Sequence, residues 1–524
     1  MKKKIFLLLL LTLGLTACGG AQPTSTAGVD VAKTNRAESF IYAIDADPIS
    51  INPITASDRY GLTTVNMVFQ PLARIGVDGE IVNELADDIQ WSADGLTLTV
   101  TLKDDLKWSD GEPLTADDVV FTYKHRADKA NGNSDNLWIE GQPVKFEKVD
   151  EKTINFRLPA VSTSALEAVL TEKYIMPKHI YQDLKDFSDQ RLEGREVIGS
   201  GPYKLVAYKP GQYLHFTRNE NYNGEPAKIK EMVFQIIANA DTKKVALQNG
   251  DVDAAVVRPQ DRQEFDEETF NTQPYSENRV GYIGFNMKRP GLKNQKFRQA
   301  LMYALNREDL NKVAYQDEKL YTNAPTFLPP KTPYFSPDAF HYEHDAKKAR
   351  ALLQEAGQGD TTLALGFDAD DPVQRNVTAL IQQQLQDVGV KVKLQPADPS
   401  ALSAATQDPD KSPYDLFLNG YIMGIHPNLY RALFTSDGFS NYFGFQDPEI
   451  DRLFDEGAKE PDEEKGKAIY KELQGKLNEK AGIYPMVDNK KIFVSHKRVS
   501  GFKEAKFVPI YTLEHFDKLE LQKP

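Results

Sequence analysis

Apolar and polar residues alternate between Leu96 and Leu102, and this alternation predicts a strand with one buried face. Every second position is leucine or valine, while Thr97, Thr99 and Thr101 occupy the positions between them. A strand of this kind needs a second layer of structure against its apolar face. The stretch therefore predicts one half of a packed unit.

A turn and a capped helix follow that strand. Asp110 and Gly111 predict the turn. Thr115, followed three residues later by Asp118, has the spacing of a capping box, and apolar residues continue to Tyr123. The unit contains no nucleophile, metal-binding cluster or phosphate-binding loop, so its role is predicted to be structural.

Helices and strands also alternate in the second half of the chain, which argues for an α/β fold. Gly357 stands at the C-cap position of one predicted helix. The predicted strands are 280–286 and 390–394, and the predicted helices are 296–305, 345–357 and 377–389.

The N-terminus has the features of a bacterial secretory signal. Lysines at positions 2–4 precede an apolar run at 5–15, which is too short for a stable membrane-spanning helix. The run ends in LTACG, which resembles a lipobox and predicts that Cys18 carries diacylglycerol; an ordinary cleaved signal with an incidental cysteine is the alternative. Residues 1–17 are thus predicted to be the signal peptide and 18–36 a flexible lipidated tether.

Length and composition narrow the class of protein. A chain of 524 residues with 40% hydrophobic and 27% charged residues is typical of a globular protein with two or three cores. Its net charge of −13 argues against nucleic acid as a partner. Cys18 is the only cysteine, so its lipidation would leave no thiol for a disulfide, a nucleophile or a metal site.

The sequence shows no catalytic constellation. It contains no G-x-S-x-G, H-E-x-x-H or Walker lysine loop. His341 and His344 form the best metal-like pair, but a solvated helix start is the favoured interpretation, and no metal or cofactor is predicted. Three classes stay open on composition alone: a receptor that binds solute between two lobes, a lipid-tethered hydrolase, and an adhesion lipoprotein. The missing catalytic residues count against an enzyme.

Several motifs distinguish these classes. Residues 107–123, KWSDGEPLTADDVVFTY, closely resemble the signature of family 5 of the bacterial extracellular solute-binding proteins, the receptors of ABC importers for peptides, nickel complexes and related solutes. VIGSGPY at 197–203 and KFRQALMYAL at 296–305 are similar to further family motifs, and the resemblance extends over nearly the whole mature chain. It implies a periplasmic-binding-protein-like α/β fold of type II, cluster C.

In that fold, two α/β lobes are joined by hinge crossings and enclose the ligand in a cleft, and an accessory domain is added. The hinge candidates are 199–202, 274–282 and 484–489. The predicted division is lobe I at 37–66, 199–275 and 488–524, the accessory domain at 67–198, and lobe II at 276–487.

Aromatic residues beside Gly, Pro, Asn or Asp in predicted loops are expected near the ligand, and core packing is the alternative for each of them. These residues are Tyr60, Trp108, Trp138, Tyr421 and Tyr442.

The segment 420–428, GYIMGIHPN, bears on the ligand. The resemblance implies that in peptide-binding relatives a carboxylate after a Gly-Trp pair binds the α-amino group of the ligand. This segment has no Asp or Glu, and it has His426 where an aspartate is usual. Two interpretations are open. Either the ligand is a metal chelate or another solute, since the short spacing resembles nickel-binding members, or a peptide is held by backbone groups and its amino group is paired elsewhere. The backbone groups would be those of Tyr421, Ile422, Met423, Gly424 and Ile425.

A peptide is the predicted ligand, because peptides are the commonest ligands of the family. His426 is expected to be a structural turn residue beside Pro427, with contact to a ligand or metal as the alternative. Since the segment carries no carboxylate, N-acetylation of a peptide is predicted to weaken binding by less than about tenfold.

The resemblance also implies partners and a location. We expect a monomeric receptor, anchored through Cys18 on the extracytoplasmic face of the membrane, that delivers its solute to the permease subunits of an ABC importer.

Overall fold

The computed structural model describes residues 35–76, 78–132, 134, 137–358 and 361–522. Cys18, the signal peptide and nearly all of the predicted tether lie outside the described residues. The division into lobe I, accessory domain and lobe II stays a prediction, and the three names are used below for the ranges given above.

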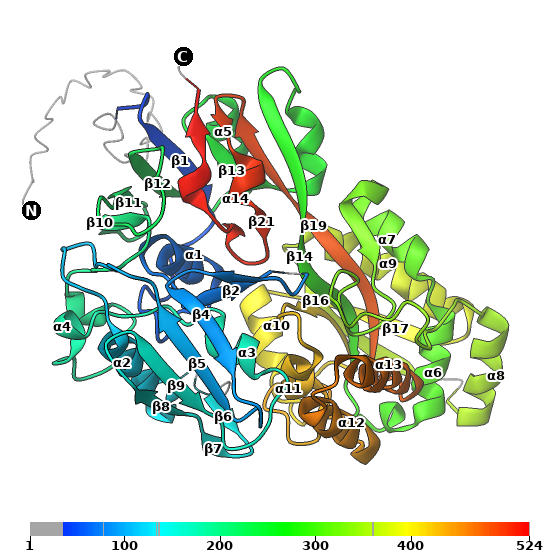
Figure 1. Ribbon diagram of the computed structural model, residues 1–524. Helices are drawn as coiled ribbons and strands as arrows, with labels where there is room; N and C mark the ends of the chain where they lie inside the picture. The colour runs from blue at the N-terminus through cyan, green and yellow to red at the C-terminus, as the bar shows by residue number, and fades with distance from the viewer. Residues whose placement is uncertain (1–34, 77, 133, 135–136, 359–360, 523–524) are drawn as a thin grey trace, which may run out of the picture.

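One eleven-stranded mixed sheet runs through both lobes (Figure 1). Parallel pairing of β1 with β12 and of β16 with β17 confirms the α/β class in each half. In order across the sheet the strands are β10 (Tyr203–Lys209), β11 (Tyr213–Arg218), β12 (Glu231–Ile236), β1 (Ser39–Ile44), β13 (Ala254–Val257), β19 (Ile483–His496), β14 (Phe270–Phe285), β18 (Leu416–Tyr421), β16 (Thr362–Asp368) and β17 (Lys391–Ala397), while β15 (Tyr321–Asn323) pairs with β19.

Two long antiparallel strands connect the halves. β14 and β19 lie side by side through the centre of the molecule, and their register shifts between Ser276 and Val280 (Figure 1). The hinge candidates 274–282 and 484–489 lie within these strands. The predicted strand 280–286 is therefore confirmed as the end of a strand of 16 residues. The first part of that strand was not predicted, because Pro274 and the polar residues around it do not form an apolar pattern.

The third hinge candidate owes its glycines to close packing. A Cβ at Gly199 or Gly201 would overlap the backbone of Val68, and neither glycine has a positive φ. The amide of Gly201 donates a hydrogen bond to the carbonyl of Val68 over 2.8 Å. Glycine is needed here for close approach rather than for an unusual backbone angle.

The lobe I core is aromatic. Phe40, Tyr42 and Phe234 pack with Phe493 and Phe516, which come from near the C-terminus. The other helices and strands of this region are α1 (Arg59–Val68), α5 (Ala240–Gln248), β20 (Val499–Ser500), α14 (Phe502–Ala505), β21 (Phe507–Val508), β22 (Thr512–Leu513) and β23 (Glu520–Leu521).

The accessory range has its own sheet and core. The predicted alternation is confirmed in β5 (Thr97–Leu102), whose leucines and valine are buried. The predicted capping box is confirmed as well, with Thr115 and Asp118 capping α2 (Ala116–Ala127). The remaining elements are β2 (Ala73–Ile75), β3 (Ile81–Asn83), β4 (Ala86–Trp91), β6 (Trp138–Ile139), β7 (Gln142–Pro143), β8 (Lys145–Lys148), β9 (Thr153–Arg157), α3 (Ala165–Leu170) and α4 (Lys178–Tyr181).

Helices cover the lobe II end of the sheet. Gly357 ends α8 with a left-handed backbone, as predicted. The helix predicted at 377–389 begins earlier, at Pro372, because Asp371 caps it and proline suits the first helical position. The helices are α6 (Gln295–Ala304), α7 (Arg307–Tyr315), α8 (Ala346–Ala356), α9 (Pro372–Asp387), α10 (Pro399–Thr406), α11 (Arg431–Phe434), α12 (Pro448–Lys459) and α13 (Glu463–Glu479).

Candidate ligand-binding cleft

A cavity of about 290 Å³ borders the loop that follows β18, and we call it the Met423 cavity. Its walls come from all three predicted domains: residues 422–425 of lobe II, 167–173 of the accessory domain, and 508–511 of lobe I. A space bounded by three separately packed regions is a common position for a ligand site, since relative movement can open and close it.

Glu167 of α3 reaches across to the lobe II loop. Its carboxylate accepts hydrogen bonds from the backbone N–H groups of Ile425 and His426, each over 3.0 Å. Gly424, with φ of +96°, lies against this carboxylate, and a Cβ there would overlap it. Burial raises the pKa of Glu167 to about 7, although the two backbone donors favour the ionised form.

Two further ionisable groups flank Glu167. Glu172 accepts a hydrogen bond from the Tyr511 hydroxyl over 2.8 Å. Lys173 is buried and donates to the carbonyl of Thr171, and burial lowers the pKa of its ammonium to about 7. Glu514 and Arg74 also line this cavity, and Arg74 pairs with Glu84. The three carboxyl groups of the lining therefore outnumber its one lysine, which forms no ion pair among the described residues.

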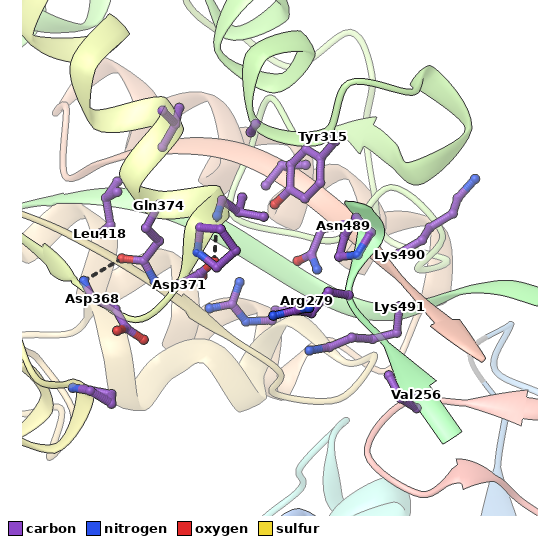
Figure 2. A pocket seen from close by; sticks show the side chains of 18 of the residues that line it. Val256, Arg279, Tyr315, Asp368, Asp371, Gln374, Leu418, Asn489, Lys490 and Lys491 are labelled. Atoms are coloured by element: carbon purple, nitrogen blue, oxygen red, sulfur yellow. Dashed lines mark hydrogen bonds between the residues drawn. The ribbon is translucent and has the colours of Figure 1, made fainter. Parts of the chain in front are cut away.

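A larger cavity of about 620 Å³ lies between lobe I and lobe II, and we call it the Arg279 cavity (Figure 2). Arg279 and Lys491 enter it from β14 and β19, and Asp371 and Tyr315 border it from the lobe II helices. Asn278 lines the Met423 cavity and Arg279 lines this one, so consecutive residues of β14 face the two spaces.

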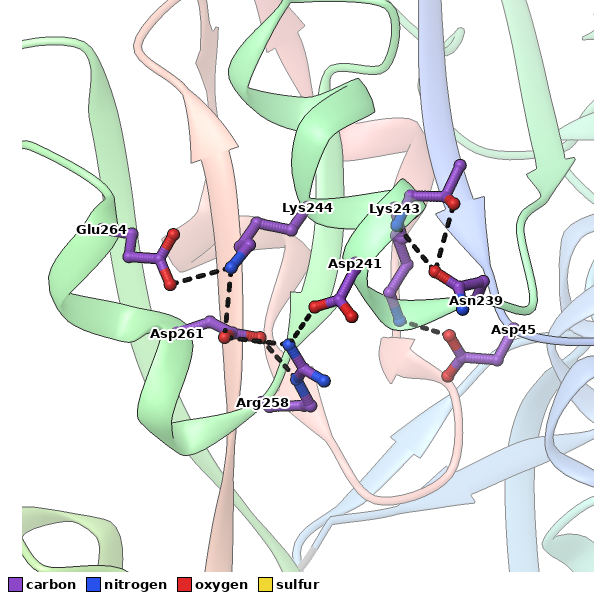
Figure 3. Close-up of polar contacts among 9 residues, drawn as sticks. Asp45, Asn239, Asp241, Lys243, Lys244, Arg258, Asp261 and Glu264 are labelled. Atoms are coloured by element: carbon purple, nitrogen blue, oxygen red, sulfur yellow. Dashed lines mark hydrogen bonds and ion pairs between the residues drawn. The ribbon is translucent and has the colours of Figure 1, made fainter. Parts of the chain in front are cut away.

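The lobe I wall of the Arg279 cavity is a network of ion pairs (Figure 3). Lys243 of α5 pairs with Asp45, which follows β1. Arg258 pairs with Asp241 over 2.5 Å and with Asp261 over 2.6 Å. The charges of this wall are therefore largely matched within the protein.

The structure brings the predicted backbone segment to the cleft. Ile422, Met423, Gly424 and Ile425 line the Met423 cavity. Tyr421 lines neither cavity: its ring is buried and its hydroxyl donates to the carbonyl of Phe327 over 2.8 Å.

His426 has a structural role of the kind expected. It caps the 3₁₀ helix at Pro427–Tyr430, where its Nδ1 accepts the backbone N–H of Asn428. It is 6% exposed, its ring packs edge-on against Tyr334 and Tyr470, and burial lowers its pKa to about 4. Such an imidazole is neutral at physiological pH.

The remaining predicted aromatics lie outside the lining of both cavities, and Tyr60 alone contacts a lining residue. The hydroxyl of Tyr60 donates to Asp45 over 2.9 Å, at the edge of the Arg279 cavity. Trp108 is fully buried in the accessory core, and Trp138 donates to the carbonyl of Ala127 in the same domain. Tyr442 packs against the aromatic core of lobe II. None of these four side chains borders either cavity.

Sequence reasoning missed the charged groups of the cleft. Segment 420–428 has no carboxylate of its own, but Glu167 binds its backbone from a distance of more than 250 residues along the chain. Only long-range packing brings them together. For Arg279, a signal was present: Glu277 and Arg279 are the only charged residues of β14, and they directly precede its apolar end.

The described ranges hold no group of three or more His, Cys, Asp or Glu side chains able to bind a metal ion. His341 contacts Glu343 and the carbonyl of Ala339, and it precedes α8 rather than lying on it. Across the part of the chain that is described, none of the helices is long and apolar enough to span a membrane.

Comparison with known proteins agrees with this architecture. Residues 80–441 match the model of the bacterial extracellular solute-binding proteins, family 5 middle region. The crystal structure of the ABC transporter substrate-binding protein CtaP from Listeria monocytogenes is 36% identical, covers 92% of this chain and 99% of its own, and superposes with a TM-score of 0.88.

Two curated relatives differ in what their names say they bind. The oligopeptide-binding protein AppA of Bacillus subtilis is 26% identical, with 90% of each chain covered. The nickel-binding periplasmic protein of Escherichia coli is 25% identical, with 92% of this chain and 94% of the relative covered.

Proposed function

Because the chain belongs to family 5 of the bacterial extracellular solute-binding proteins, we propose that it captures peptides in its interlobe cleft and delivers them to the permease of an ABC importer. The names of relatives, among them an oligopeptide-binding protein, support a peptide as the ligand. The observation that carries this proposal is the carboxylate of Glu167 at the loop 422–425, where the family resemblance calls for an acid.

Glu167 and Glu172 suit the α-amino group of a peptide. A carboxylate offers about four acceptor positions, and each oxygen of Glu167 uses one of them on a backbone N–H. An ammonium group in the Met423 cavity would form charge-assisted hydrogen bonds with the remaining positions. The backbone of Ile422 and Met423 would pair with the peptide main chain, which leaves side-chain identity loosely specified.

Calorimetric titration of ligand-free protein tests the proposal. The ligands are short peptides with free amino groups, the same peptides N-acetylated, and nickel with and without histidine. We expect the free-amino peptides to bind and acetylation to weaken binding by more than about tenfold, which revises the smaller loss expected from the sequence.

Substitutions of the two carboxylates test which residues recognise the free amino group. Glu167→Gln and Glu172→Gln are expected to reduce the preference for the free amino group, whereas Glu147→Gln, on the exposed face of the accessory sheet, should keep it. Tight binding of the nickel complex together with no binding of any peptide would contradict peptide capture and favour the metal-chelate alternative.

We also propose that Cys18 anchors the receptor. Replacement of Cys18 by Ser should move the protein from the membrane fraction to the soluble fraction, because the lipid has no other attachment point on the chain. Peptide affinity of that variant should equal that of the wild type. Retention of the variant in the membrane fraction would contradict the anchor.

A further inference from the structure

Hydrogen bonds outside both cavities join the accessory domain to lobe II. Thr163, just before α3, donates its backbone N–H to the carbonyl of Ala458 over 2.8 Å. Its hydroxyl donates to the carbonyl of Gly457 over 3.0 Å. Thr163 and its two acceptor residues line neither the Met423 cavity nor the Arg279 cavity. These bonds therefore do not depend on a ligand.

The two acceptors belong to the last turn of α12. Carbonyls in the last turn of a helix have no N–H partner within the helix. Gly357 closes α8 by donating its own N–H back to that helix, whereas Glu460, the C-cap residue of α12, makes no such bond among the described residues. Thr163 thus caps α12 from another domain, and the end of this helix becomes a docking point for the accessory domain.

An ion pair lies beside this cap. Lys459, the last residue of α12, pairs with Glu140 over 2.5 Å. Glu140 and Gly141 form the two-residue turn between β6 and β7, and both have a positive φ. A turn of this kind favours Asn, Asp or Gly at its first position, so the local backbone does not explain a glutamate there. The contact with lobe II gives this glutamate a role.

The contacts continue inward to the Met423 cavity. Asn428 donates to the hydroxyl of Ser164 over 3.4 Å, and Glu167 binds the backbone of Ile425 and His426. Figure 1 shows β6, β7 and α3 of the accessory domain facing α12 of lobe II. The contacts thus run from the protein surface to the wall of the cavity, and rotation about the hinge strands β14 and β19 would break them together.

We propose that Thr163 and Glu140 form a clasp with α12 that holds the accessory domain against lobe II before any ligand binds. The free receptor is then mainly closed, and a ligand enters only when the clasp opens. Thr163 contributes more than Glu140, because an exposed ion pair adds little stability. The clasp goes beyond peptide capture, since it sets the conformation of the receptor without ligand.

Distances between two spin labels test the clasp without any ligand. Cys18→Ser leaves a chain with no cysteine, so Lys145→Cys on β8 and Glu472→Cys on α13, both at exposed positions, can be labelled. Double electron–electron resonance should give one main, closed distance. Thr163→Val should raise the open population with its longer distance about fivefold. Thr99→Val is the matched control, since its hydroxyl contact lies within the accessory sheet, and it should change nothing.

Charge reversal tests the ion pair in the same assay. Glu140→Lys should raise the open population about twofold, because it places two cations together. Glu140→Lys combined with Lys459→Glu should restore the closed distance. A mainly open distance in the labelled background, or no response to Thr163→Val, would overturn the inference.

Peptide kinetics give a second readout, which rests on the peptide function proposed above. A clasp that closes both the free and the bound receptor slows peptide entry and exit alike. Thr163→Val should therefore raise the association and dissociation rates together, about fivefold, and leave the dissociation constant nearly unchanged. An unchanged association rate with weaker binding would mean that the free receptor is open, and would contradict the clasp. If no peptide binds while the distances respond as expected, the clasp stands and the peptide function fails.

Discussion

The two cavities use adjacent positions of the same elements and carry opposite charge. Asn278 and the loop 422–425 face the Met423 cavity, where Glu167, Glu172 and Glu514 gather, while Arg279, one residue further, faces the other with Lys491. The irregular backbone of β14 at Asn278, which has a positive φ and lies at the register shift between Ser276 and Val280, thus separates acid from base across the hinge. Each cavity therefore favours a ligand group of the opposite charge.

Two glycines repeat this contrast within one short stretch. Gly420 makes room for the Arg279 guanidinium, and Gly424, four residues later, makes room for the Glu167 carboxylate. The two differ in backbone: Gly424 has a positive φ, whereas Gly420 has the ordinary backbone of a strand. Substitution of each glycine therefore tests one end of the cleft at a time.

Gly424→Ala should have the largest effect. The added methyl group strains the left-handed backbone and displaces Glu167 from its backbone donors. We expect the binding free energy of a free-amino peptide to weaken by about 2 kcal/mol, which raises its dissociation constant roughly thirtyfold. Gly141→Ala is the matched control, since Gly141 also has positive φ but has no atom within 4 Å of the added Cβ. Equal affinities of the two variants would show that the Glu167 contact is not used.

The contrast between these glycines was not accessible from the sequence. The strand at Thr97–Leu102, the capping box at Thr115 and the C-cap at Gly357 could be predicted, because each depends on residues close together in the chain. The family motifs extended this to the fold. The loop 422–425 was identified in the same way, from its own local pattern.

The missing part of the site depends on packing between distant segments. Glu167 lies on a helix of six residues with nothing unusual in its sequence, and its position at Ile425 follows from how the accessory domain packs against lobe II. Trp108 shows the opposite case. The Ser, Asp and Gly residues that follow it are typical of an exposed loop, yet its indole is buried in the accessory core. Local pattern cannot distinguish these cases.

The pH dependence of binding should sharpen the contrast at the acidic end. In the free protein the pKa of Glu167 is about 7, so below that pH a ligand ammonium must displace a proton. Lys173, whose pKa is lowered to about 7, is charged over the same range and repels the ammonium. Both effects make affinity for free-amino peptides rise with pH up to about 7. Above that, the peptide's own α-amino group, with an ordinary pKa of about 8, begins to lose its charge and the rise ends.

Titrations between about pH 5.5 and 7 measure this rise, which should approach tenfold per pH unit for Glu167 alone. N-acetylated peptides should show no such rise, and Glu167→Gln should reduce it to the part that is due to Lys173. Calorimetry in two buffers of different ionisation enthalpy should detect proton release on binding at pH 6. Affinity that falls as the pH is raised would contradict a role for ionised Glu167.

Gly420→Ala should have the smallest effect, and only at the basic end. The added Cβ overlaps the guanidinium of Arg279, but that group is the far end of a flexible side chain and can move aside while the strand keeps its pairing with Gly281. We therefore expect a loss of about threefold for peptides with a free carboxylate, less than 1 kcal/mol, and none for their amides. The measurement is the ratio of acid to amide affinity by calorimetry. If both ligand forms lose affinity equally, the substitution distorts β18 itself. The loss would then not be caused by displacement of the Arg279 charge.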